Sequence, residues 1–347
     1  MRILAADVGG TKTLVSLYEG EPGAFREIAA RRYDSRRFAG LSPIVADFLG
    51  EAARTLDAAA IGVAGPVIED TCRATNLPWQ LDARAIARDL GVGRVRLLND
   101  FEAIALGVDE LPDDALEVLQ DRPAVAGAPK AILGAGTGLG EAILLPAPDG
   151  GLPRVLATEG GHTDFAPRDE TEIALLRFLL RRHAHVSYER ILSGPGIEAL
   201  YEFVVAHGLA EERPEHARRL ANAEDRAAEI GAAALSGSDP ASVRAISMFA
   251  SIYGAEAGNL ALKTLPFGGV YVAGGIAAKL APLLRSGELV RAFRDKGRME
   301  PVLDRIRVSL VLEPRVGLLG ARRVAAWLAG SVTSRRAGAP TRGAGDR

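Results

Sequence analysis

The sequence predicts an α/β protein of two domains, each with a mixed sheet flanked by helices. Two strand-turn-strand segments, ILAADVGGTKTLVSLY at residues 3–18 and AILGAGTGLGEAILL at residues 131–145, each carry a Gly/Thr turn between apolar runs and indicate a duplicated architecture. Strand-like and helix-like patterns alternate over the first hundred residues, which is typical of an α/β sheet. The length of 347 residues suffices for about two domains.

The composition is ordinary for a globular chain and excludes several functional classes. Hydrophobic residues make up 48% and charged residues 25%, and a formal net charge of −2 gives no basic excess for a nucleic-acid surface. No apolar run reaches the roughly 18 residues of a membrane span, and the first strand follows with no signal-like segment. The lone Cys72 forms no internal disulfide or thiolate cluster. We therefore expect a cytoplasmic protein that acts on small molecules, with no nucleic-acid or membrane partner.

The smaller domain is expected to comprise residues 1–108 and 314–330. Strand-like patterns occur at residues 3–8, 13–18, 59–64 and 94–98. Helical patterns cover residues 43–56 and 82–90, and the second of these helices has Asp82 as N-cap and Gly91 just past its end. The stretch over residues 109–129, rich in Pro, Asp and Ala, is expected to lead into the second domain.

The larger domain is expected to span residues 109–313 and to open with the second hairpin. A short strand ends at Thr158, and Asp169 with Glu172 has the spacing of a capping box ahead of a helix over residues 170–182. The tail over residues 331–347 has little apolar content, so we expect it to be disordered. The other predicted elements are strands at 270–273 and 306–312 and helices at 222–235, 240–265, 276–284, 289–296 and 317–328.

The glycine turns of the two hairpins are candidates for phosphate binding. Consecutive backbone N–H groups without side chains form an anion nest, although a tight hairpin alone also explains a Gly/Thr turn. Neither G-x-G-x-x-G ahead of a helix nor a P-loop is present. Asp7 ends an apolar strand, where an acid needs a partner, and it could hold Mg²⁺ directly or through water. Thr11 and Thr137 add hydroxyl donors, and the Gly274-Gly275 turn lets a ring or a phosphate approach a helix N-terminus.

Five polar residues are candidates for an acceptor site. Asn99 and Asp100 end a strand and enter a helix, where they either cap the helix or place a carboxylate at the ligand edge of the sheet. Glu159 and His162 flank two glycines and can face one pocket, and Glu189 precedes a glycine turn. An exposed loop and a surface acid are the alternatives for these three. As a set they suit a sugar, whose hydroxyls both donate and accept, and a sugar beside a triphosphate indicates phosphoryl transfer.

These motifs resemble those of the bacterial glucokinases of the hexokinase/actin/Hsp70 superfamily, in the branch without zinc cysteines. The likeness covers nearly the whole chain, through ADVGGTKT, GVAGPV, TNLPW, LNDFEAIALG, GAGTGLG, TEGGHTDFAP, ERILSGPG, VAGGIAAK and GLLGA in the family's order. It implies two actin-like (ribonuclease H-like) domains around a central cleft, with the C-terminal helix returning to the small domain. It also implies Mg²⁺-dependent transfer of the ATP γ-phosphate to the 6-hydroxyl of glucose, giving glucose 6-phosphate and ADP, with no zinc.

The resemblance further implies a role for each motif residue. Asp100 is expected to be the general base, and Asp7 to hold the magnesium through water. The expected sugar ligands are Asn99, Asp100, Glu159, His162 and Glu189. The expected phosphate and nucleotide ligands are Ala6, Asp7, Val8, Gly9, Gly10, Thr11, Gly136, Thr137, Gly274 and Gly275.

Two other functional classes use this scaffold. A sugar-responsive transcriptional regulator is expected to carry a DNA-binding extension ahead of the first strand, and here that strand begins at Ile3. An acetate kinase or a chaperone ATPase leaves the polyol-type acceptor set unexplained, so a glucokinase is the function we expect. No pattern in the sequence fixes the oligomeric state, and a homodimer is compatible with it.

Overall fold

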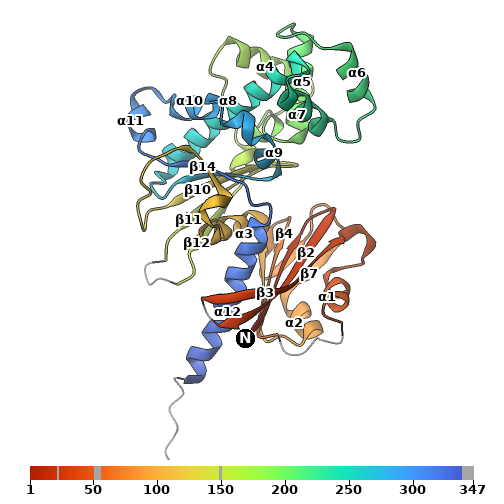
Figure 1. The fold of residues 1–347 in the computed structure, drawn as a ribbon, viewed down its shortest axis with the longest axis vertical. Helices are drawn as coiled ribbons and strands as arrows, with labels where there is room; N and C mark the ends of the chain where they lie inside the picture. Colours follow the sequence, from red (N-terminus) through yellow and green to blue (C-terminus); the bar gives the residue numbers. More distant parts are fainter. Residues whose placement is uncertain (22, 51–55, 148–150, 338–347) are drawn as a thin grey trace, which may run out of the picture. The chain divides into compact units, whose positions relative to one another are not determined.

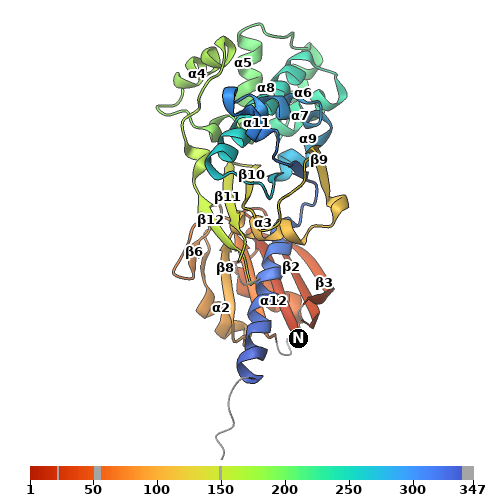
Figure 2. The same ribbon diagram turned by 90° about the vertical axis from the view of Figure 1, so that its left-hand side faces the viewer.

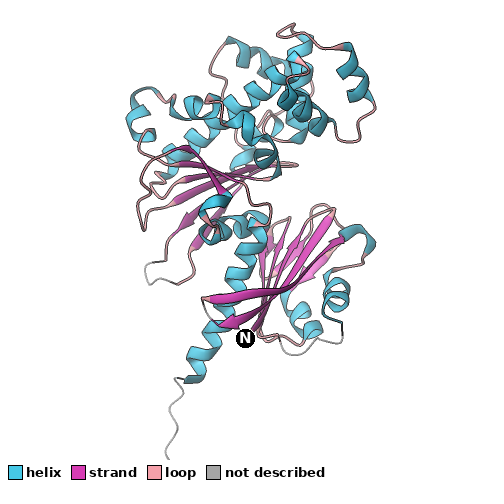
Figure 3. Ribbon diagram, in the orientation of Figure 1, coloured by secondary structure: helices cyan, strands magenta, loops and turns pink. Residues whose placement is uncertain are grey.

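The computed structural model describes residues 1–21, 23–50, 56–147 and 151–337, which form two compact units (Figure 1). Unit 1 contains Met1–Leu111 and the chain from Arg315 onward, and unit 2 contains Pro112–Pro314. Each unit has a hydrophobic core of its own, and each combines strands with helices (Figure 3).

Unit 1 is built on a five-stranded sheet with the order β3-β2-β1-β4-β8. Strands β1, β2 and β3 pair antiparallel, whereas β1, β4 and β8 run parallel. Val8 pairs with Val63, and Val63 pairs with Asn99, so the three parallel strands end at one edge of the sheet. The strands are Arg2–Val8 (β1), Lys12–Glu21 (β2), Ala24–Asp34 (β3), Ala58–Val63 (β4) and Val95–Asn99 (β8).

Helices cover both faces of this sheet. On one face, Leu4 and Ala6 of β1 share an apolar cluster with Ile44 of α1 and Ile86 of α2. On the other face, the C-terminal helix α12 packs against β1, β4 and α3, and it runs beside these strands in Figures 1 and 2. The helices are Ser35–Arg37 (η1), Leu41–Leu49 (α1), Ala83–Leu90 (α2), Asp100–Gly107 (α3), Val108–Glu110 (η3) and Val316–Ala337 (α12), and a small sheet comprises Val67–Ile68 (β5), Thr71–Arg73 (β6) and Gln80–Asp82 (β7).

Unit 2 repeats the topology of unit 1. Its sheet has the order β12-β11-β10-β13-β14-β9, in which β10, β11 and β12 pair antiparallel and β10, β13 and β14 run parallel. The additional strand β9 pairs antiparallel with β14. The strands are Leu116–Gln120 (β9), Lys130–Ala135 (β10), Leu139–Leu145 (β11), Arg154–Thr158 (β12), Val270–Ala273 (β13) and Val308–Val311 (β14).

The long helix α8 is the centre of the core of unit 2. Its buried residues include Phe249, Tyr253 and Leu260, which belong to one cluster with residues from the sheet and from the surrounding helices. No helix among the described residues is long and apolar enough to cross a membrane. The helices are Asp113–Ala115 (η4), Gly160–His162 (η5), Glu170–Leu180 (α4), Tyr188–Arg190 (η6), Gly194–Ala206 (α5), Pro214–Ala221 (α6), Arg226–Ser236 (α7), Pro240–Thr264 (α8), Gly275–Leu284 (α9), Glu288–Arg294 (α10), Gly297–Met299 (η7) and Glu300–Leu303 (α11).

The two hairpins, the strand at residues 270–273 and the helix caps at Asp82 and Gly91 are found as predicted. The capping box is half formed: the Asp169 carboxylate accepts from the Glu172 N–H, but the Glu172 side chain accepts from the Arg168 N–H. Helix α12 continues to Ala337, so the first part of the tail predicted to be disordered is helical, and residues 338–347 lie outside the described residues. The predicted helix over 43–56 is described only as α1, because residues 51–55 also lie outside them.

Candidate active site

The turn after β1 is a four-residue hairpin turn held by a serine from elsewhere in unit 1. The Gly9 N–H donates to the Lys12 carbonyl at 2.9 Å. The Ser35 hydroxyl donates to the Gly9 carbonyl at 2.8 Å, and the Ser35 N–H donates to the Thr11 carbonyl at 3.1 Å. A Cβ atom on Gly10 would lie 2.6 Å from Cβ of Asn76, so only glycine fits there. Sequence reasoning missed Ser35, whose role depends on a contact between distant segments.

Asp7 lies at the carboxyl end of β1, close to the charge of Asp100. It is half-buried. Burial, followed by the charge of Asp100, raises the pKa of its carboxyl from 3.8 to about 6, and Lys12 opposes the rise. Two carboxylates at one edge of a sheet favour a cation between or beside them. The flanking Ala6 and Val8 are fully buried in β1, so only their backbone could serve a ligand.

Asn99 joins strand β8 to helix α3 and uses both ends of its amide. Its side-chain oxygen accepts from the N–H groups of Phe101 at 2.9 Å and Glu102 at 3.4 Å, and its Nδ2 donates to the Gly65 carbonyl at 3.0 Å. Asn99 is therefore the N-cap, which was one of the two alternatives. Asp100 is the first residue of α3, and its Oδ1 accepts from the Phe101 N–H at 3.0 Å. A carboxylate is favourable in the first turn of a helix.

Glu159, His162 and Glu189 come together in unit 2. His162 Nε2 lies 4.0 Å from Glu159 Oε2, and His162 Nδ1 lies 3.9 Å from Glu189 Oε1. The Glu159 and His162 side chains are 87% and 59% exposed, whereas that of Glu189 is 29% exposed. We call these three residues the acceptor cluster. Its open imidazole and carboxylate groups can bind several hydroxyl groups of one ligand.

Glu189 also supports the second glycine turn. Its Oε2 accepts from the Leu139 N–H at 3.0 Å, and a Cβ atom on Gly138 would lie 2.3 Å from that oxygen. The Gly136 N–H donates to the Gly138 carbonyl at 2.8 Å, and the Gly194 N–H donates to the Gly136 carbonyl at 2.9 Å. The acceptor cluster and the 136–138 turn are thus joined through one side chain.

A cavity of about 560 Å³ opens beside the 136–138 turn. This is within the usual size range of ligand pockets. Its walls come from the turn and from helices α5, α7 and α9, and are mostly apolar with a few polar side chains such as Lys279. Gly274 and Gly275 do not line the cavity. Gly274 has a φ of 93°, and a Cβ atom there would lie 2.6 Å from the Ala135 carbonyl oxygen. Gly275 begins α9, and Ile276 and Leu280 of that helix line the cavity. The walls from α5 and α7 were not predicted.

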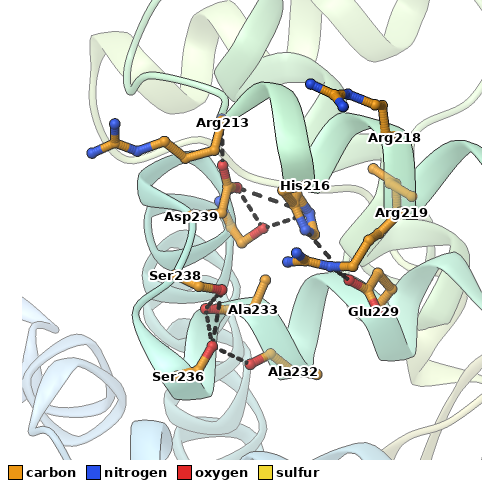
Figure 4. A network of polar contacts seen from close by, with 12 residues as sticks. Arg213, His216, Arg218, Arg219, Glu229, Ala232, Ala233, Ser236, Ser238 and Asp239 are labelled. Carbon is orange, nitrogen blue, oxygen red and sulfur yellow. Dashed lines mark hydrogen bonds and ion pairs between the residues drawn. The ribbon is translucent and has the colours of Figure 1, made fainter.

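Polar contacts hold α7 on a face that does not line the cavity (Figure 4). Glu229 of α7 accepts from Arg219 Nε of α6 at 2.8 Å and lies 3.5 Å from Nδ1 of the buried His216. His216 contacts Ser242 of α8 at 3.1 Å, and the Ser242 hydroxyl donates to Asp239, the N-cap of α8, at 2.7 Å. We infer that this network keeps α7 in place as a cavity wall.

Comparison with known proteins decides the family. A family model for glucokinase matches residues 4–327. A glucokinase from Trichormus variabilis is 42% identical over 341 residues, which cover 94% of this chain and 99% of that protein. The chain belongs to the glucokinase family. This membership confirms the predicted resemblance and the predicted enzyme class, an ATP-dependent hexose kinase.

Solved glucokinase structures have the same fold. A glucokinase from an Antarctic psychrotroph superposes with a TM-score of 0.80 at 28% identity, over 93% of this chain and 98% of that one. A ROK family glucokinase from Streptomyces griseus, solved with glucose and AMPPNP, superposes with a TM-score of 0.65 at 22% identity, over 94% and 99%. The predicted fold class, two actin-like domains with mixed sheets, is therefore confirmed.

Proposed function

We propose that this member of the glucokinase family transfers the γ-phosphate of ATP to the 6-hydroxyl of glucose, giving glucose 6-phosphate and ADP. The observation that carries the proposal is the acceptor cluster, in which an imidazole lies within about 4 Å of two carboxylates beside a glycine turn. A sugar offers several hydroxyls in fixed directions, and each can bridge such groups. The proposed sugar ligands are the acceptor cluster together with Asn99 and Asp100.

Asp100 is the proposed general base. Its carboxylate accepts the proton of the 6-hydroxyl while the hydroxyl oxygen bonds to the γ-phosphorus and the bond to the ADP oxygen breaks. General-base help is worth about 10²–10⁴-fold, and positioning with charge stabilisation accounts for the rest. The place of Asp100 at the start of α3, anchored by the Asn99 cap, supports this role because it fixes the backbone that carries the carboxylate.

The proposed nucleotide ligands lie in and beside the two glycine turns. The Gly9 N–H is used within its turn, so Gly10 and Thr11 are the donors we assign to the phosphates there. Gly136 and Thr137 line the cavity beside the second turn, and we assign the adenosine to that cavity. Its apolar walls suit a flat base, and Gly274 and Gly275 contribute by setting where α9 begins.

Magnesium is the metal that this reaction implies, and the residues fit it. Asp7 offers carboxylate oxygens, which Mg²⁺ prefers as ligands. Burial and the charge of Asp100 favour the neutral form of this carboxyl group, and a bound cation offsets both effects. Among the described residues no three or more His, Cys, Asp or Glu side chains form a metal-binding group. Asp7 would therefore hold the ion through its waters, where the ion neutralises phosphate charge.

The test is a coupled assay for glucose 6-phosphate with glucose, ATP and Mg²⁺, run beside Asp100→Ala. We expect the variant to fold, to bind glucose weakly and to lose about 10²–10⁴-fold in kcat, because the proton of the hydroxyl then has no acceptor. Asp113→Ala, at an exposed aspartate of η4, is the control and should keep the wild-type rate. A variant rate above about a tenth of wild type would remove Asp100 from the role of base.

A further inference from the structure

Two buried glutamates that the proposed mechanism does not use interact with each other in unit 2. Glu141 of β11 is 3% exposed, and Glu256 of α8 is fully buried. The Oε1 atom of each has no hydrogen-bond partner among the described residues. Two ionised carboxylates that share a buried site repel each other, whereas one proton between them gives a hydrogen bond and leaves a single negative charge.

Glu141 lies directly beneath the turn that carries Glu159 and His162. It pairs with Thr158 of β12, whose hydroxyl donates to the Glu141 carbonyl at 3.1 Å and accepts from the Gly160 N–H at 3.1 Å. A Cβ atom on Gly160 would lie 2.0 Å from Glu141 Oε2. The carboxyl group of Glu141 therefore packs against the backbone of the turn itself, between Glu159 and His162.

Glu256 is connected by hydrogen bonds to the segment that carries Glu189, the third residue of the acceptor cluster. Its Oε2 accepts from Asn259 Nδ2 at 2.9 Å, and the same Nδ2 donates to the Tyr188 hydroxyl at 3.0 Å. Tyr188 directly precedes Glu189 in the short helix η6 and is 3% exposed. Contacts of the two glutamates thus reach both the 159–162 turn and the segment that bears Glu189.

We propose that Glu141 and Glu256 are positioning residues that share one proton, and that this proton holds the acceptor cluster in its sugar-binding arrangement. The proposal rests on the proposed function, because it takes the ligand of that cluster to be a hexose. Neither glutamate touches the sugar. Both act through the backbone of the 159–162 turn and through Tyr188.

The electrostatics of the pair agree with this geometry. Burial, followed by the charge of Glu256, raises the pKa of Glu141 from 4.5 to about 8, and burial also raises the pKa of Glu256. The folded pair therefore keeps a proton through neutral pH and loses it above about pH 8.

The other ionisable groups around the pair come from several elements. Lys263 lowers the pKa of both glutamates, and Lys296 lowers that of Glu256; burial lowers the pKa of Lys296 itself. Tyr188 and Tyr253 keep their protons because burial raises the pKa of each. Above the pair, the 159–162 turn carries His162 and Glu159. Variants of Glu141 are needed to separate the pair from these groups.

The test measures KM for glucose between about pH 6 and pH 10 in the wild type, Glu141→Gln and Glu141→Leu. If sugar binding requires the shared proton, the wild-type KM rises by up to about tenfold per pH unit above about pH 8. Glu141→Gln keeps a neutral donor of the same shape, so its KM matches the wild type at neutral pH and stays flat above it. Glu141→Leu loses the hydrogen bond and has a raised KM already at neutral pH.

Glu172→Gln is the matched control, because Glu172 of α4 is also buried but pairs with Arg168, which lies just ahead of that helix. It should keep the wild-type profile of KM against pH even if its stability falls. The proposal would be overturned if KM for glucose rose with pH in Glu141→Gln as it does in the wild type, or if Glu141→Leu had the wild-type KM at neutral pH.

An infrared measurement separates this proposal from the proposed function. A protonated buried carboxyl group gives a C=O band at neutral pH, which should vanish in Glu141→Gln and titrate away near pH 8 in the wild type. If no variant turns over glucose, the proposed function fails and the band still tests the shared proton. Absence of the band at neutral pH overturns the shared proton whatever the activity.

Discussion

At the scale of single residues, Glu189 joins two functions that the sequence presents as separate motifs. One carboxylate oxygen accepts from the Leu139 N–H beside the second glycine turn, and the other faces His162 in the acceptor cluster. Glu159, by contrast, is 87% exposed and contacts only His162 among these groups. The two glutamates should therefore respond differently to substitution, although both are proposed sugar ligands.

We expect Glu189→Ala to raise KM for glucose about 10–100-fold, since a hydrogen bond to a charged group is worth about 1.5–3 kcal/mol. It should also raise KM for ATP, because the Leu139 N–H loses its acceptor and the 136–138 turn loosens. Glu189→Gln keeps an acceptor oxygen and should change only the glucose value. Glu159→Ala is the control, with an effect on glucose alone. Steady-state kinetics with each substrate varied in turn give both KM values for the wild type and for each variant. An equal KM for ATP in Glu189→Ala and wild type would contradict the dual role.

At the scale of elements, the cap of α3 ties stability to the proposed catalytic residue. Asn99 bonds two N–H groups of the helix and reaches the Gly65 carbonyl, so its loss affects both the helix start and the neighbouring loop. Asp82 caps α2 in the same unit through a single bond of 2.8 Å to the Ala85 N–H. Helices α2 and α3 thus have caps of similar type, of which only the cap of α3 adjoins a proposed ligand site.

We predict that Asn99→Ala lowers the free energy of unfolding by about 1 kcal/mol or somewhat more, as caps usually do. It should also raise KM for glucose, since an amide that can bind a hydroxyl is lost. Asp82→Ala should lower stability by a similar amount with no change in KM. Urea unfolding and kinetics on the two variants check this. A rise in KM of the same size in both would mean that Asn99 acts through stability alone.

Strand β3 and helix α5 were not predicted from the sequence, each for its own reason. Strand β3 is an edge strand whose residues are mostly exposed, so it carries charges on both faces and shows no alternation of apolar and polar residues. Helix α5 begins with Gly194-Pro195-Gly196, which resembles a turn, although Ser193 as N-cap and proline in the first turn are signals that could have identified it. The glycine turns and the polar motifs were predictable because each is local in sequence.

At the scale of the whole molecule, the repeated sheet topology explains both what was predictable and what was not. Two hairpins with the same pattern indicate the duplication, which the strand orders of the two units bear out. The cavity of unit 2, in contrast, is formed by a turn and three helices far apart in the sequence, and no local pattern encodes its walls. The Glu141–Glu256 pair could not be predicted from the sequence either, because the two residues lie on a strand and a helix more than a hundred residues apart.

The separate cores of the two units lead to a prediction about ligand-dependent stability. Both tryptophans, the buried Trp79 and the 45% exposed Trp327, lie in unit 1, whereas helices α4–α11 all lie in unit 2. Tryptophan fluorescence therefore follows the unfolding of unit 1, and the far-ultraviolet circular dichroism is dominated by unit 2. Each probe reports the stability that a ligand adds to the unit it binds.

We predict that adenosine at about 100 times its Kd stabilises unit 2 by about 2.7 kcal/mol, because it binds the folded cavity and not the unfolded chain. The urea midpoint by circular dichroism should rise while the fluorescence midpoint stays constant. AMPPNP with glucose should raise both, since the proposed ligands include residues of each unit. Guanosine serves as the control for recognition of the base. A fluorescence midpoint that moves with adenosine as far as the dichroism does would show that the two units unfold as one, and would contradict the prediction.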